Sequence, residues 1–262
     1  MKKKRDIKAR VKAQYAEVAA KGDSRRPRHE RPRDSIEKAV AIGYSEQEMK
    51  SVPAEAAVTH GCGNPTALAE LKAGETVLDL GCGGGLDAFL AAQRVGRKGK
   101  VIGLDMTPEM IEKARANARV GDYTNVAFEV AEIERLPLPD DSVDVVISNC
   151  VINYSRDKLR VFREVHRVLK PGGRLFVSDL VTSGKLSEDV LRNAGKLWTE
   201  WLAVASDRRT YLSAARAAGF RTIVVVAEGP FPTAEADNAL KGRIISIQVK
   251  SVKQERAVRR LS

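Results

Sequence analysis

The sequence is short of cysteine, of aromatic residues and of long apolar runs. Its three cysteines, Cys62, Cys82 and Cys150, are too few and too scattered among 262 residues for a disulfide-stapled secreted domain. Free thiols in a reducing compartment are therefore expected. No apolar run approaches the ~20 residues needed to cross a bilayer, and the N-terminus lacks the apolar stretch of a secretory signal. These absences predict a cytoplasmic protein that does not associate with membranes.

Histidine is equally scarce, and this bears on metal binding. His29, His60 and His166 have no metal-ligand spacing, so no metal site is predicted. His60 lies close enough to Cys62 to raise its thiolate fraction, although a lone histidine beside a thiol is not itself a site.

Positive charge is concentrated toward the two ends. Runs such as SRRPRHERPR and KQERAVRR contribute to a net charge of +11, and like-charge runs are typical of solvated tails. We expect a loosely ordered basic arm over residues 1–35, with one helix at 7–20 and little core, and a basic tail over 251–262. Basic tails attract nucleic acid without a specific site, but no RNA-binding module is recognisable, so nucleic acid is the weaker expectation.

Residues 36–250 have the pattern of one α/β domain. Short apolar runs alternate with longer helical segments, which is typical of a parallel sheet covered by helices. The last two runs are joined by a segment too short for a helical crossover, which favours an antiparallel last strand. The pattern predicts a Rossmann-like, seven-stranded, mostly parallel sheet, with a helical cap at 184–206. The predicted strands are 76–80, 100–104, 126–130, 143–148, 174–178, 222–226 and 244–249. The predicted helices are 88–95, 108–119, 158–168, 188–205 and 208–217.

A glycine-rich turn carries the strongest local signal of function. In TVLDLGCGGGLD a strand ends in Asp79 and runs into Gly81, Gly83 and Gly85 at the start of a helix. Glycines there let a nucleotide-bearing ligand lie against the backbone. The alternative is a tight strand-to-helix turn without a ligand.

Two acids help to choose the cofactor. Asp105, at the end of the next strand, can accept hydrogen bonds from both ribose hydroxyls of a nucleoside. A nicotinamide dinucleotide would satisfy that pattern too, but Asp79 would face its pyrophosphate unfavourably. Asp79 suits an amino group and a sulfonium instead, which favours S-adenosylmethionine.

These residues resemble the class I S-adenosylmethionine-dependent methyltransferases, whose first motif is similar to VLDLGCGGG. The resemblance implies that Asp79 and the three glycines line the methionine end of the cofactor and that Asn149 faces the methyl group. It also implies ribose and adenine contacts from Asp105, Met106, Glu132 and Ile133.

A narrower resemblance covers residues 44–183. The strings HGCGNP, DMTPEM, SNCVIN and SDLVTS are similar to those of arsenite methyltransferases, in which cysteine thiolates hold trivalent arsenic beside the cofactor. Thiolates are soft ligands suited to a thiophilic centre. Cys62 and Cys150 match that family's positions, whereas Cys82 lies in the glycine turn and is expected to be structural.

The sequence departs from that family at other cysteines. Trp201 stands where a further cysteine is expected, and the segment KGDSRRPR lacks the family's N-terminal cysteine. Trp198 and Trp201 fall in the cap at 184–206, which we expect to hold the acceptor site. They either pack this cap or line the binding site of an organic acceptor. A small-molecule acceptor, arsenite or methylarsenite by resemblance, is therefore expected. The alternatives are an organic metabolite, RNA, and a non-catalytic protein that keeps only the cofactor cleft.

Overall fold

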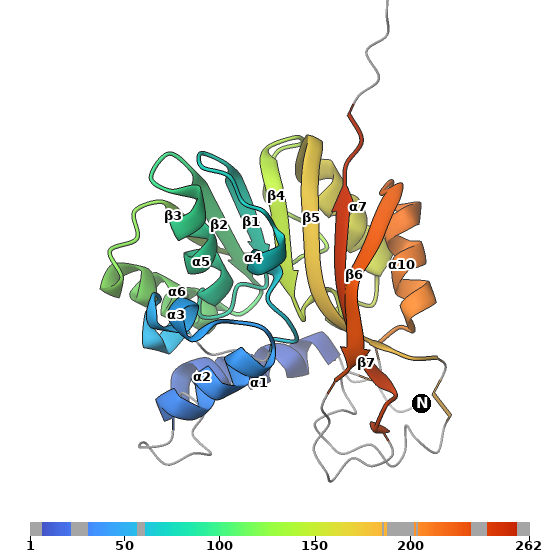
Figure 1. Cartoon of the computed structure of the whole chain (residues 1–262), viewed down its shortest axis with the longest axis horizontal. Coiled ribbons are helices and arrows are strands. Elements are labelled where there is room, and N and C mark those ends of the chain that lie inside the picture. The colour runs from blue at the N-terminus through green and yellow to red at the C-terminus, as the bar shows by residue number, and fades with distance from the viewer. Residues whose placement is uncertain are drawn as a thin grey trace, which may run out of the picture.

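The computed structural model describes residues 7–21, 31–56, 61–184, 186–187, 202, 204–231 and 240–255. Within them lies a seven-stranded sheet of order β3-β2-β1-β4-β5-β7-β6 (Figure 1). The seven predicted strands are all present: β1 (Thr76–Leu80), β2 (Lys100–Asp105), β3 (Val126–Val130), β4 (Val143–Asn149), β5 (Leu169–Thr182), β6 (Thr222–Pro230) and β7 (Ile244–Val252). β7 runs antiparallel to both β5 and β6, while β1 to β5 pair in parallel. The predicted Rossmann-like fold is confirmed.

Helices cover both faces of the sheet. α5 (Leu86–Val95) and α6 (Pro108–Val120) share one apolar cluster with residues of β1, β2 and β4. α7 (Lys158–Val168) and α10 (Arg208–Ala217) share the other, with residues of the opposite face. The central strands are buried on both sides, as their continuous apolar sequences require. Before β1 lie the helices α2 (Arg31–Ala41), α3 (Glu46–Lys50) and α4 (Pro65–Leu68) and the 3-10 turn η1 (Ala54–Ala56). A second 3-10 turn, η2 (Ile152–Tyr154), follows β4.

The ends of two helices and the start of β5 show how the sequence sets local structure. Asp157 caps α7 by accepting from the backbone N–H of Arg160. Thr107 stands at the N-cap position of α6 but makes no side-chain capping bond. α7 ends at Val168 and β5 begins at Leu169, so the LKPGG segment belongs to the strand. Backbone bonds between Gly172 or Gly173 and Lys253 keep the segment within the sheet.

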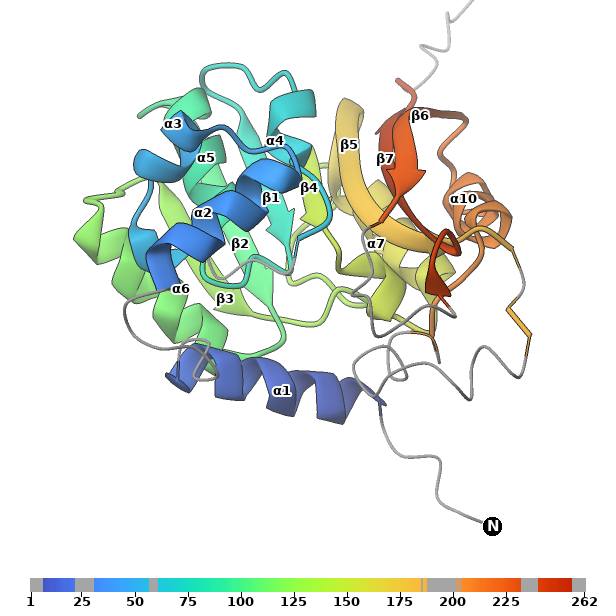
Figure 2. The ribbon, with the colours of Figure 1, turned by 60° about the horizontal axis from the view of Figure 1, so that its bottom comes forward.

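Two stretches of the expected basic arm are helical in the structure. The predicted helix is present as α1 (Ile7–Lys21), and α2 begins inside the expected arm. α1 lies beside α6, below the arrowhead of β4 in Figure 1 and along the lower edge in Figure 2. Val11 of this helix is buried against Val204, and Tyr15 and Met106 pack against the same small cluster.

Other predictions on organisation are not tested. The boundaries at residues 35 and 250 stay predictions, and most of the proposed cap at 184–206 lies outside the described residues. In the part of the chain that the structure describes, we find no helix with the length and apolar character of a membrane span.

Candidate cofactor and acceptor site

A pocket lies at the carboxyl ends of β1, β2 and β4, where an open α/β sheet binds its ligands. Gly81 has a φ of +69°, and a Cβ there would lie 2.3 Å from a methyl group of Val151. Gly83 has a φ of +51°, and a Cβ there would meet no described atom within 4 Å. Its backbone N–H donates to Asp105 at 3.1 Å. The predicted residues that line the pocket are Asp79, Gly81, Gly83, Asp105, Met106, Glu132, Ile133, Asn149 and Cys150.

Gly85, which the resemblance places at the methionine end of the cofactor, does not line the pocket. It is the N-cap of α5 with a φ of +97°. A Cβ there would lie 2.7 Å from the ring of Phe89. Close packing between the turn and α5 therefore explains this glycine.

Buried carboxylates give the pocket its negative character. Asp79 is 2% exposed, and its Oδ2 has no hydrogen-bond partner among the described residues. Burial, with the nearby carboxylates of Asp87 and Asp105, raises the pKa of Asp79 well above its usual value. Burial also raises the pKa of Asp87 to about 6, although Tyr44 and Asn149 donate to it. A cation in the pocket would offset the cost of burying these carboxylates.

α1 supplies a wall that the sequence analysis missed. Lys8, Val11 and Tyr15 line the pocket. Lys8 Nζ lies 3.0 Å from Glu132 and 2.9 Å from Glu134, so an ion pair joins α1 to the segment after β3. The basic character of the N-terminus concealed the apolar spacing of Val11 and Tyr15, four residues apart on one helical face.

Cys150, one of the two cysteines predicted to bind the acceptor, lines the pocket, and Cys62 is bonded to it. Cys62 and Cys150 form a disulfide with Cα atoms 5.9 Å apart, although 88 positions separate them. The expectation of free thiols is wrong for this pair in the structure. Cys62 is buried, while Cys150 is half-buried, has a φ of +59° and lines the pocket directly. The two sulfurs are brought together by the loop before α4 and the turn after β4.

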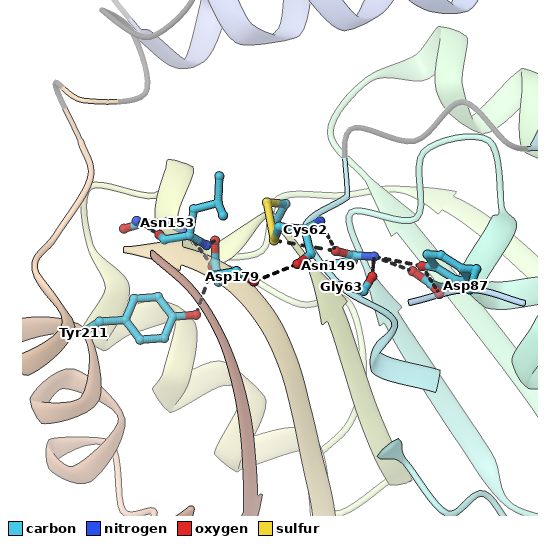
Figure 3. The surroundings of a disulfide bond; sticks show 11 residues. Cys62, Gly63, Asp87, Asn149, Asn153, Asp179 and Tyr211 are labelled. Atoms are coloured by element: carbon cyan, nitrogen blue, oxygen red, sulfur yellow. Dashed lines mark hydrogen bonds between the residues drawn. A yellow bond between two sulfur atoms is a disulfide. The ribbon is translucent and has the colours of Figure 1, made fainter. Parts of the chain in front are cut away.

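Asn149 connects the lining of the pocket to the loop that carries Cys62. Its Oδ1 accepts from the backbone N–H of Cys62 at 3.0 Å, and its Nδ2 donates to the carbonyl of Gly63 at 2.7 Å. The same Nδ2 lies 3.2 Å from Oδ2 of Asp87 (Figure 3). Asn149 is thus both a pocket residue, as predicted, and a tether for the loop that carries Cys62.

A third polar group stands beside the disulfide. A carboxylate oxygen of Asp179, on β5, and the sulfurs of Cys62 and Cys150 all lie within 4.8 Å of one another. Asp179 is fully buried, and it accepts from the hydroxyl of Tyr211 at 2.9 Å and from the backbone N–H of Asn153 at 3.0 Å (Figure 3). Burial raises its pKa to about 6. Asp179 belongs to the SDLVTS string of the sequence, but only the pairing of β4 with β5 shows that it lies beside the two cysteines.

The remaining candidate residues divide into two groups. Cys82 is unpaired and buried in the wall of the pocket, where burial raises the pKa of its thiol, in keeping with a structural role. Trp198, Trp201 and His60 lie outside the described residues.

The fold and the pocket together define a Rossmann-like domain for a nucleoside cofactor that carries positive charge. Comparison with known proteins narrows this class. A family described as a methyltransferase domain matches residues 71–219. An arsenite methyltransferase from Halobacterium salinarum is 48% identical over 184 residues, covering 70% of this chain and 47% of the relative. Another, from Aquipseudomonas alcaligenes, is 38% identical over 72% of this chain and 56% of the relative.

A solved structure agrees with these relatives. The arsenic(III) S-adenosylmethionine methyltransferase from Chlamydomonas reinhardtii is 36% identical, with a TM-score of 0.66, over 84% of this chain and 74% of the other. The chain therefore belongs to the S-adenosylmethionine-dependent methyltransferases. It spans about half the length of the two curated relatives.

Proposed function

We propose that this protein transfers the methyl group of S-adenosylmethionine to trivalent arsenic held by the reduced thiols of Cys62 and Cys150. The observation that carries the proposal is the meeting of these two sulfurs beside the pocket, with Cys150 in its wall. The similarity to arsenite methyltransferases supports the same acceptor.

The pocket residues fit the proposed cofactor. Its ammonium and sulfonium charges would supply the missing partner of Asp79 Oδ2 and offset the buried charge of Asp87. Asp105 would hold the ribose, while Met106, Glu132 and Ile133 would contact the adenine. When bound, S-adenosylmethionine supplies an electrophilic methyl group, which an arsenic lone pair can take up as the carbon–sulfur bond breaks and its electrons return to sulfur.

The chain's own residues would bind and orient the acceptor. An external thiol reductant first supplies two electrons and two protons to the Cys62–Cys150 disulfide. The two thiols then displace two hydroxides of arsenous acid, with each thiol proton leaving in a water molecule. Asn149 keeps Cys62 at the pocket through its bond to the backbone N–H. Positioning of donor and acceptor in line supplies much of the catalysis of such displacements.

Calorimetric titration with arsenite tests the proposal. The protein is reduced with a phosphine, freed of it, and titrated with S-adenosylhomocysteine present. Wild type should bind one arsenite, Cys62→Ser and Cys150→Ser should lose most of that affinity, and Cys82→Ser should keep it. Binding of S-adenosylhomocysteine without any binding of arsenite would overturn the arsenic acceptor. An organic acceptor, which Trp201 at the expected cysteine position favours, would then take its place.

A further inference from the structure

The arsenic site proposed above has two thiols, whereas trivalent arsenic takes three donors. Of the chain's three cysteines, Cys82 is buried in the glycine turn and does not belong to the group of donor atoms that lie within 4.8 Å of one another around the disulfide. The described residues instead place a carboxylate oxygen of Asp179 within 4.8 Å of both paired sulfurs. Two sulfurs and one carboxylate oxygen therefore lie close enough together to bind one arsenic atom.

Asp179 is held firmly enough to act as a fixed ligand. Its carboxylate accepts from the hydroxyl of Tyr211 and from the backbone N–H groups of Asn153 and Leu180. An ionised carboxylate offers about four lone-pair positions, so three hydrogen bonds leave roughly one for a further partner. Asn153 in turn donates to the carbonyl of Leu180, which fixes the turn after Cys150 against β5.

We propose that Asp179 is the third donor to arsenic, in a site of two thiolates and one carboxylate. The inference rests on the proposed function, because it completes the same acceptor site. Its carboxylate oxygen would displace the last hydroxide of the thiol-bound arsenic, and that hydroxide would take a proton from solvent and leave as water. No change of oxidation state accompanies this step.

The chemistry of the donors predicts a distinctive ligand preference. Oxygen is a harder ligand than sulfur, so this site should hold inorganic arsenite less tightly than three thiolates would. An arsenical that already carries one carbon substituent has only two exchangeable positions. It needs both cysteines but has no position left for Asp179.

Titration of reduced wild type and Asp179→Asn with arsenite and with phenylarsine oxide tests the inference. The variant should bind arsenite roughly tenfold more weakly, as expected for one lost interaction with a charged group, and should bind phenylarsine oxide as wild type does. Equal affinity of wild type and variant for arsenite would overturn the proposal. So would an equal loss for both arsenicals, because that result means that Asp179 only shapes the thiol site.

Tyr211→Phe is the matched control, since it removes a hydrogen bond to Asp179 but keeps the carboxylate. It should retain most of the arsenite affinity. Asp179→Cys supplies a third sulfur and should bind arsenite more tightly than Asp179→Asn, and melting temperatures verify that each variant is folded. If wild type binds neither arsenical, the proposed function fails; if only the Asp179→Asn difference is missing, the third donor alone fails.

Discussion

The backbone N–H of Cys62 donates to the side-chain oxygen of Asn149 at 3.0 Å. The amide nitrogen of the same asparagine lies 3.2 Å from Asp87 and bonds to the carbonyl of Gly63. One side chain therefore joins Asp87, a carboxylate of the pocket, to the loop that carries Cys62.

Replacing Asn149 with alanine should weaken both sites together. The loop with Cys62 loses its tether, and Asp87 loses a donor, so we expect the affinities for arsenite and for S-adenosylmethionine each to fall about tenfold. Calorimetric titration of each ligand measures this. Asn125→Ala is the control, because Asn125 bonds the carbonyls of Ala92 and Gly96 and does not line the pocket. A loss confined to one ligand would show that Asn149 does not connect the two sites.

Replacing Asp79 with asparagine should stabilise the free protein while weakening cofactor binding. The variant has no ionisable group at this position, so it avoids the cost of ionising a buried carboxylate whose Oδ2 has no partner among the described residues, and it should be more stable than wild type once the pH exceeds the raised pKa of Asp79. The S-adenosylmethionine affinity should fall by roughly tenfold or more, because the carboxylate no longer faces the cationic ligand. Thermal unfolding with and without ligand measures both effects. A variant that is destabilised yet binds normally would contradict this placement of the cofactor.

The stabilisation by cofactor should depend on pH. Burial raises the folded-state pKa of Asp87 to about 6, above its ordinary value of 3.8. The free protein therefore gains stability from the protonated form at low pH and loses it as pH rises through about 6. A cation favours the ionised form, so S-adenosylmethionine should raise the melting temperature more at pH 7.5 than at pH 5. An equal rise at both values would argue against carboxylates as its binding partners.

The ion pair of Lys8 should help α1 to close the pocket. Replacing Lys8 with glutamine removes its bonds to Glu132 and Glu134, and we expect roughly two- to fivefold weaker S-adenosylmethionine binding, typical of a partly exposed pair. Lys12→Gln, on an exposed part of the same helix, serves as the control. Fluorescence titration at low and high salt should show the difference between the variants shrinking as salt increases. If Lys8→Gln and Lys12→Gln bind S-adenosylmethionine with the same affinity at each salt concentration, the ion pair of Lys8 does not contribute to cofactor binding.

The sheet was predictable because each strand is an apolar run bounded by turn residues, and such runs do not depend on distant partners. The last strand's direction also followed from the short connection before β7. Asp79, Gly81 and Gly83 were predictable for a similar reason, since one contiguous string sets the strand, the turn and the helix.

The rest of the site depends on contacts between distant segments. The sequence gives no direct sign that Asp179 stands beside Cys62 and Cys150, because the pairing of β4 with β5 brings them together. The role of Gly85 at the cofactor stays a prediction, because a glycine required by close packing against the Phe89 ring resembles one required by a ligand. The disulfide was missed because cysteine number and spacing do not report the distance across a folded loop.

An assay of methyl transfer measures the proposed reaction itself, the methylation of arsenic held by Cys62 and Cys150. Reduced wild type and Cys150→Ser are incubated with arsenite, a thiol reductant and S-adenosylmethionine labelled in its methyl group, and labelled arsenicals are separated and counted. We expect labelled methylarsenicals from wild type and almost none from Cys150→Ser. The proposed reaction would be contradicted if wild type binds S-adenosylmethionine normally but gives no labelled arsenical. Equal labelling by wild type and Cys150→Ser would contradict the role of Cys150.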